Sequence, residues 1–269
     1  MNFPTRCATL VLASLLPLSV QAHKAWLLPS ATVLSGNEAW ITLDGAVSND
    51  LFYFNHNPLR GEGLQIISPN GESLAPENLH TLKYRTVFDL HLTQAGTYRI
   101  ASVNRGLFAS WEENGEPKRW RGTPEAFAAA VPKRAEKLQV TQSAGRVETF
   151  VTLGAPDTRA LAPTGAGLEL VAESHPNDLF SGESARFRML IDGDPAAGLD
   201  ITLVAGGTRY RDMQAEIHAT TAADGSFTVT WPTPGMYWME TSLQDANGVT
   251  PPATQRRASY VATFEVLPQ

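Results

Sequence analysis

Short segments in which apolar and polar residues alternate recur along most of the chain, and this pattern constrains the fold more than any other feature. The segments are rich in β-branched and aromatic residues, and Gly, Pro, Asn and Asp separate them. Such alternation is typical of strands with one buried face, and many short strands separated by turns predict β-sandwiches. We therefore expect an all-β protein. The expected strands are 40–43, 51–54, 64–67, 86–92 and 97–103 in the first half, and 148–153, 168–171, 185–191, 201–204, 227–231, 237–241 and 260–266 in the second.

One helix is expected among these strands. It begins at Thr123-Pro124-Glu125, where a capping residue precedes a proline in the first turn, and continues through Ala-Phe-Ala-Ala-Ala. Just before it, the segment from Phe108 to Trp120 carries aromatic and charged residues. This segment is interpreted either as a lid or partner-binding loop, or as a hairpin held together by its aromatic side chains.

A faint internal repeat divides the chain into two halves. Ala95-Gly-Thr-Tyr98 is echoed by Pro234-Gly-Met-Tyr237, and Ser35-Gly36 by Ser181-Gly182. The repeat favours two tandem Ig-like or carboxypeptidase-regulatory-like β-sandwiches, although similar turns recur in any β protein. Because residues 155–167 are small, rich in Pro and Gly and unpatterned, they are expected to link the domains. The expected organisation is a signal peptide at 1–22, an N-terminal sandwich at 23–154, the linker at 155–167 and a C-terminal sandwich at 168–269.

The first 22 residues have the three parts of a secretory signal. Arg6 supplies the positive charge, an apolar run covers 7–20, and Val20-Gln-Ala22 offers small residues to a signal peptidase. The run is too short to span a bilayer, which needs about 20 apolar residues. Cleavage after Ala22 is therefore expected to export the protein to the periplasm. The single cysteine, Cys7, would leave with the signal.

Composition excludes several classes of function. The formal net charge is −6, and no block of Lys and Arg offers the basic footprint that nucleic-acid binding needs. No second long apolar run predicts a membrane span. The sequence also lacks a Gly-x-Ser-x-Gly elbow, a Walker loop, a Rossmann glycine pattern and a Cys-based zinc pattern. We therefore expect no enzymatic activity of these classes.

Three of the six histidines are candidate metal ligands. After the expected cleavage His23 becomes the first residue, and its α-amine and imidazole form one chelating unit. His56 lies where an aromatic segment runs into a turn, and would supply a second imidazole. Three nitrogen ligands suit copper or nickel. His175, before a proline at the opening of the second half, is a further candidate. The alternatives are that His23 follows the cleavage site by chance and that turn backbone groups satisfy His56.

The other three histidines are expected at the surface. His91 alternates with Leu90 and Leu92, so it should point away from the core. His80 and His218 lie in polar surroundings and are interpreted in the same way.

The chain resembles a periplasmic family known as domain of unknown function family 4198. The resemblance rests on Ala22-His23-x-x-Trp26-Leu-x-Pro29 and on Phe52-Tyr-Phe-Asn-His56-x-Pro58. It continues through Gly106-Leu-Phe-Ala-Ser-Trp111 and His175-Pro-Asn-Asp-Leu179. Some members are described as periplasmic components of nickel or cobalt uptake. The resemblance implies a periplasmic, metal-handling protein with His23 and His56, and less directly His175, as ligands.

Three functional hypotheses follow. The leading one is a periplasmic protein that delivers nickel, cobalt or copper to an envelope transporter or outer-membrane receptor. The second is a copper oxygenase that uses the same ligands, with Trp111 and Trp120 as a substrate platform. The third is an envelope adaptor without a metal, whose surface between Phe108 and Trp120 binds a protein partner.

Overall fold

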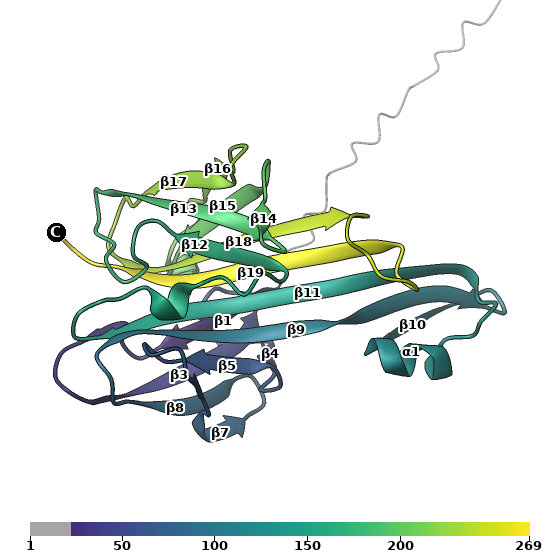
Figure 1. Ribbon diagram of the computed structural model, residues 1–269, viewed down its shortest axis with the longest axis horizontal. Helices are drawn as coiled ribbons and strands as arrows, with labels where there is room; N and C mark the ends of the chain where they lie inside the picture. Colours follow the sequence, from purple (N-terminus) through teal and green to yellow (C-terminus); the bar gives the residue numbers. More distant parts are fainter. Residues whose placement is uncertain (1–22) are drawn as a thin grey trace, which may run out of the picture.

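The structure is a computed structural model that describes residues 23–269, so the predicted signal peptide lies outside the described residues. The expectation of an all-β, sandwich-like protein is confirmed: strands form three sheets of five, ten and four members. Figure 1 shows the long strands of the ten-stranded sheet between the two smaller sheets.

The first small sheet contains β1 (Lys24–Pro29), β3 (Ala39–Ser48), β8 (Thr86–Leu92), β7 (Glu77–Thr81) and β4 (Asn57–Pro58). The second contains β12 (Leu168–Ala172), β13 (Ser184–Ile191), β14 (Asp194–Pro195) and β17 (Ser226–Thr230). The central sheet runs in the order β16 (Ile217–Thr220), β15 (Asp200–Ala205), β18 (Gly235–Asp245), β19 (Gln255–Val266), β11 (Glu136–Leu153), β9 (Gly96–Glu113), β5 (Leu64–Ile67), β6 (Ser73–Leu74), with β10 (Glu116–Gly122) beside β9 and β2 (Val33–Leu34) beside β11.

The two small sheets cover opposite faces of the central sheet. Side chains alternate along a strand, so neighbours such as Tyr260 and Val261 in β19 point to opposite faces. Tyr260 belongs to the core under the second small sheet, whereas Val261 belongs to the core under the first. In the same way β18 sends Met239 to one core and Trp238 to the other. The protein therefore has three layers with a shared middle.

The two halves of the chain meet inside this shared sheet. β11 ends the first half and β19 ends the second, and they pair in parallel from Thr141–Gln255 to Thr149–Thr263. The segment 155–167 does connect the halves, but it is packed against them. It contains a 3-10 turn, η1 (Arg159–Leu161), with Ala160 and Leu161 buried.

The internal repeat has a structural counterpart in two tyrosine corners. The hydroxyl of Tyr98 donates to the carbonyl of Gln94 over 3.0 Å, and that of Tyr237 donates to Thr233 over 2.9 Å. In each case a glycine with a φ near +130° precedes the tyrosine by two residues: Gly96 at 129° and Gly235 at 133°. Such corners are typical of Ig-like sandwiches.

One predicted strand is wrong. Residues 51–54 form a turn between β3 and β4. Phe52 has a φ of 62°, which an extended strand cannot accommodate, and Leu51 is buried in the core under the first small sheet. The apolar run therefore reflects packing of a turn. The other predicted strands are present, and the expected helix is α1 (Pro124–Ala130), with Thr123 at its N-cap.

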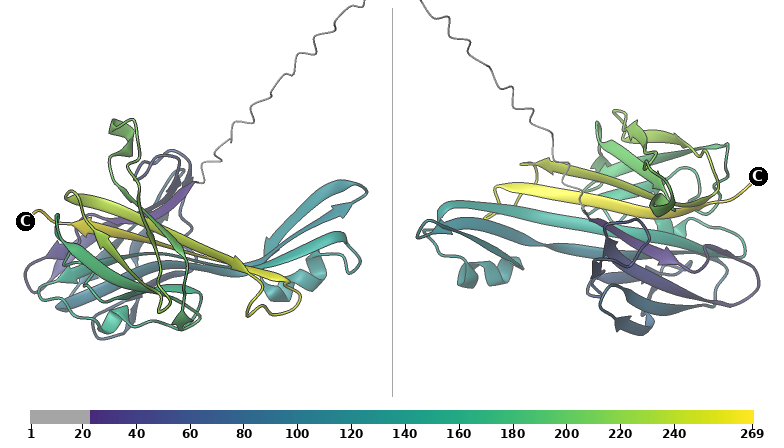
Figure 2. Two further views of the ribbon diagram at one scale, coloured as in Figure 1. Left: turned by 90° about the horizontal axis from the view of Figure 1, so that it is seen from above. Right: turned by 180° about the vertical axis from the view of Figure 1, so that it is seen from behind.

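The strands β9 and β11 extend beyond the sandwich and, with β10 and α1, form a projecting arm (Figure 2). The segment from Phe108 to Trp120 is thus a β9–β10 hairpin and not a lid. Trp111 and Trp120 are partly buried against the small core of the arm, where Trp120 meets Phe127 of α1 edge to face at 5.6 Å. They are therefore not the exposed platform that the copper oxygenase hypothesis requires.

Candidate functional site

His23 and His56 are brought together at one end of β3. Val47 of β3 pairs with Ala25 of β1 on one side and with Asn57 of β4 on the other. His23 and His56 directly precede those two strands, so both enter the sheet at the same end. Their imidazole rings stack with centroids 3.7 Å apart and planes inclined by 7°. Sequence reasoning selected these two residues, and the fold places them in contact.

The turn that carries His56 is fixed by its polar side chains. Asn55 accepts a hydrogen bond from the backbone N–H of Asn49 over 2.9 Å, and its amide donates to the carboxylate of Asp50 over 2.8 Å. Such local bonds stabilise irregular backbone that has no sheet partner. The residue before His56 therefore holds the two ends of the turn together.

An aromatic cluster supports the same turn from below. Trp26 of β1 is fully buried, and its ring meets Phe52 at 5.5 Å and Phe54 at 5.4 Å. Its indole N–H donates to the hydroxyl of Ser48 over 2.8 Å. Because Trp26 lies three residues after His23, this packing anchors the start of β1 and the turn to each other.

The stacked imidazoles are open to a ligand. Within residues 23–269, no hydrogen bond joins either ring to another residue, and His23 is exposed while His56 is half-buried. The same residues contain no group of three or more His, Cys, Asp or Glu side chains placed to hold a metal ion. Within these residues the pair therefore offers two imidazoles as its side-chain donors.

His175 lies in a different part of the molecule and is already engaged. Its Nε2 is 3.0 Å from the hydroxyl of Thr97 and 3.0 Å from the carbonyl of Asp157. Its Nδ1 accepts from the backbone N–H of Asn177 over 3.2 Å. Both ring nitrogens thus tie the start of β9 to the segment after β12. This arrangement gives His175 a structural role and separates it from the His23–His56 pair.

The remaining histidines lie largely at the surface. His80 and His218 are exposed. His91 is half-buried because its ring stacks on Trp40 at 4.3 Å, with Glu38 3.7 Å from its Nε2. These residues do not gather into a site.

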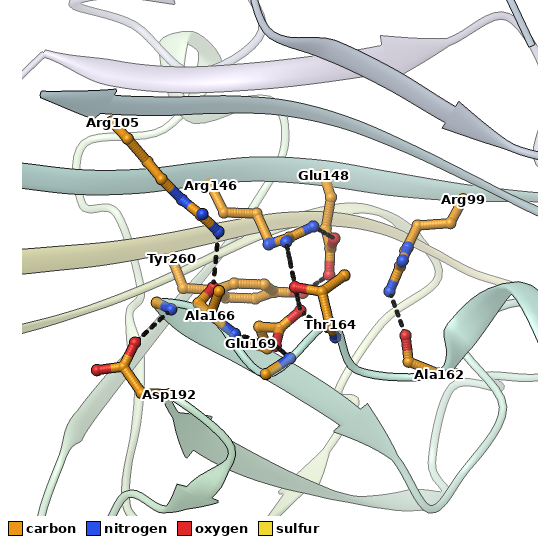
Figure 3. Close-up of polar contacts among 12 residues, drawn as sticks. Arg99, Arg105, Arg146, Glu148, Ala162, Thr164, Ala166, Glu169, Asp192 and Tyr260 are labelled. Carbon is orange, nitrogen blue, oxygen red and sulfur yellow. Dashed lines mark hydrogen bonds and ion pairs between the residues drawn. The ribbon is translucent and has the colours of Figure 1, made fainter. Parts of the chain in front are cut away.

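Sequence reasoning missed a buried charged cluster between the central sheet and the second small sheet (Figure 3). Arg146 forms ion pairs of 3.3 Å with both Glu148 and Glu169, and Tyr260 donates to Glu148. All four residues are at most 4% exposed. Burial, followed by the charge of Glu148, raises the pKa of Tyr260 well above its ordinary value, which keeps its hydroxyl a donor. The sequence does contain a sign of this cluster, because Arg146 and Glu148 alternate with the apolar Phe150 on one face of a strand.

Glu169 holds the connection between the two halves. Its carboxylate accepts from the backbone N–H groups of Thr164, Gly165 and Ala166 over 2.9, 2.7 and 3.1 Å, and from the hydroxyl of Thr164 over 2.8 Å. Burial alone would raise the pKa of Glu169, but these bonds and the charge of Arg146 outweigh it and lower the pKa. The cluster therefore orders the segment 155–167 and offers no exposed reactive group.

Comparisons with known proteins support the family and say little of the activity. No curated protein matches the chain. Among solved structures, the D0-D1 domain of Intimin is 12% identical, with 88% of this chain and 96% of that chain covered and a TM-score of 0.21. The FN1-FN3 domains of chicken CNTN1 are 9% identical, with 87% and 97% covered and a TM-score of 0.21. These values are too low to support any functional comparison.

Within residues 23–269, no helix is long and apolar enough to cross a membrane. A family model matches residues 20–245, which include the His23–His56 pair, the arm and most of both sandwiches. The chain therefore belongs to the family described as Domain of unknown function (DUF4198).

Proposed function

We propose that this chain is a periplasmic metal-binding protein that passes nickel, cobalt or copper as cargo to an envelope transporter or outer-membrane receptor. The observation that carries the proposal is the contact between the His23 and His56 imidazoles, 3.7 Å apart between ring centroids. Two imidazoles free of protein hydrogen bonds, on a supported turn and at the first residue expected after export, form a compact set of nitrogen donors.

The donor set suits late divalent metals. Cleavage after Ala22 would give His23 a free α-amine, whose proton is lost near pH 8 in model compounds and is readily displaced by a metal. Amine, His23 imidazole and His56 imidazole together make three nitrogens. Copper and nickel stand high in the affinity order for such ligands. Water would complete the coordination shell.

The stacked rings must turn before they can share one ion. The lone pair of an imidazole nitrogen lies in the ring plane, and a metal binds along it at about 2.0–2.1 Å. Two nearly parallel planes separated by a stacking distance have no common position for a metal at that length. His23 is exposed at the start of β1, so its ring is the one that can rotate. The metal-bound form is thus expected to lose the stack.

Calorimetric titration of the processed protein with Ni²⁺, Co²⁺ and Cu²⁺ tests the proposal. We expect binding tighter than micromolar for at least one ion, a large loss in His56→Ala, and a similar loss when one residue is added before His23. His80→Ala is the matched control, because His80 is exposed on β7 and outside the pair. Failure of all three ions to bind, or equal binding by His56→Ala, overturns the proposal.

The projecting arm favours one alternative, a non-catalytic envelope adaptor. In that case His23→Ala would leave the cellular phenotype unchanged, whereas a substitution in the arm such as Trp111→Ala would cause a defect. Because Trp111 packs in the core of the arm, its variant tests the whole arm and not one contact.

A further inference from the structure

The arm has one covered face and one open face. On the covered face, Leu107 and Val140 are buried beneath α1 and the loop that contains Ala253. On the open face, Phe108 is 37% exposed, and its register partner Thr141 is half-buried. Further along β11, the first small sheet covers this same side of the central sheet, and Val147 and Val151 are buried there.

The open face is hollowed to a volume of about 450 Å³ where the arm joins the body. The strand register places its main side chains on one side of the sheet. Arg121 of β10 is opposite Phe108 of β9, and Ser143 of β11 is opposite Arg257 of β19. Gln244 of β18 is in turn opposite Arg257. All of these residues line the hollow.

Glycines create the space in the middle of the hollow. Gly145 lines it, and Gly106 lies on the same face opposite Ser143. A Cβ on Gly106 would come within 2.8 Å of the carbonyl of Gly122, so only glycine allows β10 to lie this close. The centre of this face therefore has little side-chain bulk, and Arg121 and Arg257 rise on either side of it.

The hollow is cationic in a chain of net charge −6. Its lining contains Arg121 and Arg257 and no carboxylate. Within residues 23–269 neither arginine has an ion-pair partner, whereas Arg256, which points to the other face, pairs with Asp245 and Asp192 at 2.6 Å. An arginine that faces a hollow without a partner is a suitable donor for carboxylate or phosphate groups.

The spacing of the two arginines suits an elongated ligand with two anionic groups. β9 and β11 separate β10 from β19, so the strands that carry the arginines lie roughly 14 Å apart at about 4.8 Å per strand. Between them, the hydroxyl of Ser143 and the amide of Asn104 offer donors and acceptors, and the amide of Gln244 does so on the far side of Arg257. The ring of Phe108 adds an apolar surface.

We propose that this hollow binds an acidic oligosaccharide, with uronate carboxylates on Arg121 and Arg257 and sugar hydroxyls on the neighbouring amides and hydroxyls. A peptide strand added to the middle of the hollow is disfavoured because β9, β11 and β19 are each paired on both sides, so the unpaired edges of the outer strands, β10 and the part of β18 that carries Gln244, lie only at its rims. The site is separate from the His23–His56 pair and does not depend on the proposed metal cargo.

The test is a calorimetric titration of metal-free protein with trigalacturonate, with maltotriose as the uncharged counterpart. We expect millimolar or tighter binding of trigalacturonate, weakened at high salt, and no measurable binding of maltotriose. Arg121→Ala and Arg257→Ala should each weaken binding about fivefold or more, since each removes charge-assisted hydrogen bonds. Arg60→Ala, which removes the same charge from an exposed site outside the hollow, should bind as the wild type does.

A second variant separates a shaped site from general attraction of anions. Ser143→Leu fills the hollow without changing the charge, so it should abolish trigalacturonate binding while an unchanged thermal unfolding midpoint shows that the fold is intact. Absence of trigalacturonate binding, wild-type binding by both Arg121→Ala and Arg257→Ala, or full binding by Ser143→Leu overturns the proposal.

Discussion

Replacing Glu169 by glutamine tests how the two halves are joined. Glu169 is 2% exposed, and its carboxylate accepts four hydrogen bonds from residues 164–166, in addition to its 3.3 Å ion pair with Arg146. An amide keeps one acceptor oxygen, but it turns an NH₂ group toward donors and leaves Arg146 with only Glu148 as an ion-pair partner. The change therefore removes the charge and several of its bonds with very little change in volume.

The expected cost is large for one residue. Removing one partner of a buried ion pair typically costs about 3–5 kcal/mol. Arg146 keeps its ion pair with Glu148, and the glutamine keeps one acceptor oxygen, so the cost falls at the lower end of this range. We therefore expect Glu169→Gln to lower the free energy of unfolding by about 3 kcal/mol at pH 7. The cost should depend on pH. Because the folded pKa of Glu169 is lowered, its stabilisation is fully present above about pH 4.5 and is lost as the pH falls through the folded pKa.

Urea unfolding of wild type and variant between pH 7 and pH 3 measures both effects. Glu173→Gln is the matched control, since Glu173 follows the same strand but is exposed, where its pairs with Arg186 and Arg188 are screened by solvent. Its effect should be much smaller. The reasoning is refuted if Glu169→Gln costs less than about 1 kcal/mol at pH 7, or if the difference from wild type does not shrink toward pH 3.

Three further predictions concern the corners, the turns and the arm. Tyr98→Phe and Tyr237→Phe each remove the hydrogen bond of a tyrosine corner, so each should lower the free energy of unfolding by about 1 kcal/mol. Urea unfolding measures this change, and an unchanged stability in either variant would contradict a stabilising role for its corner. Gly96 has a φ of 129°, and a Cβ added there would lie 2.6 Å from the Cβ of Pro69, so Gly96→Ala should lower the free energy of unfolding by more than about 2 kcal/mol. Gly115 faces open space, and Gly115→Ala should cost about 1 kcal/mol; equal shifts of the urea midpoint in the two variants would contradict this difference. Phe127→Ala should speed amide hydrogen exchange in 107–111 and leave 258–264 unchanged, whereas faster exchange in both would show that the arm and body unfold together.

The fold class was predictable because strand periodicity is a local property. Segments such as 86–92 alternate so regularly that every second residue is buried, and the burial of β8 follows this pattern. The turn at 51–54 misled the prediction because Leu51 and Phe52 are apolar for packing reasons. Local sequence does not distinguish an apolar turn over a buried tryptophan from a short buried strand.

The candidate site was partly predictable for a different reason. His23 and His56 were selected for their chemistry, and their contact depends on both lying next to the same end of β3, which no short-range pattern specifies. His175 was selected by its position near the boundary, but its ring nitrogens serve Thr97, Asp157 and Asn177. The arginines of the open hollow come from strands 136 positions apart in the chain, Arg121 and Arg257, so only the register of the sheet reveals that they share a face.

The parallel pairing of β11 with β19 explains why a boundary expected from composition does not separate two independent units. Each half supplies strands to the same sheet, and neighbouring residues such as Tyr260 and Val261 belong to different cores. Removing residues 168–269 would therefore expose one edge of β11 and the face of Phe150 together. An unpaired edge beside an uncovered apolar face is a site of aggregation and not of stable truncation. It follows that residues 23–154 alone should not fold as a monomer, although the internal repeat makes that half look complete.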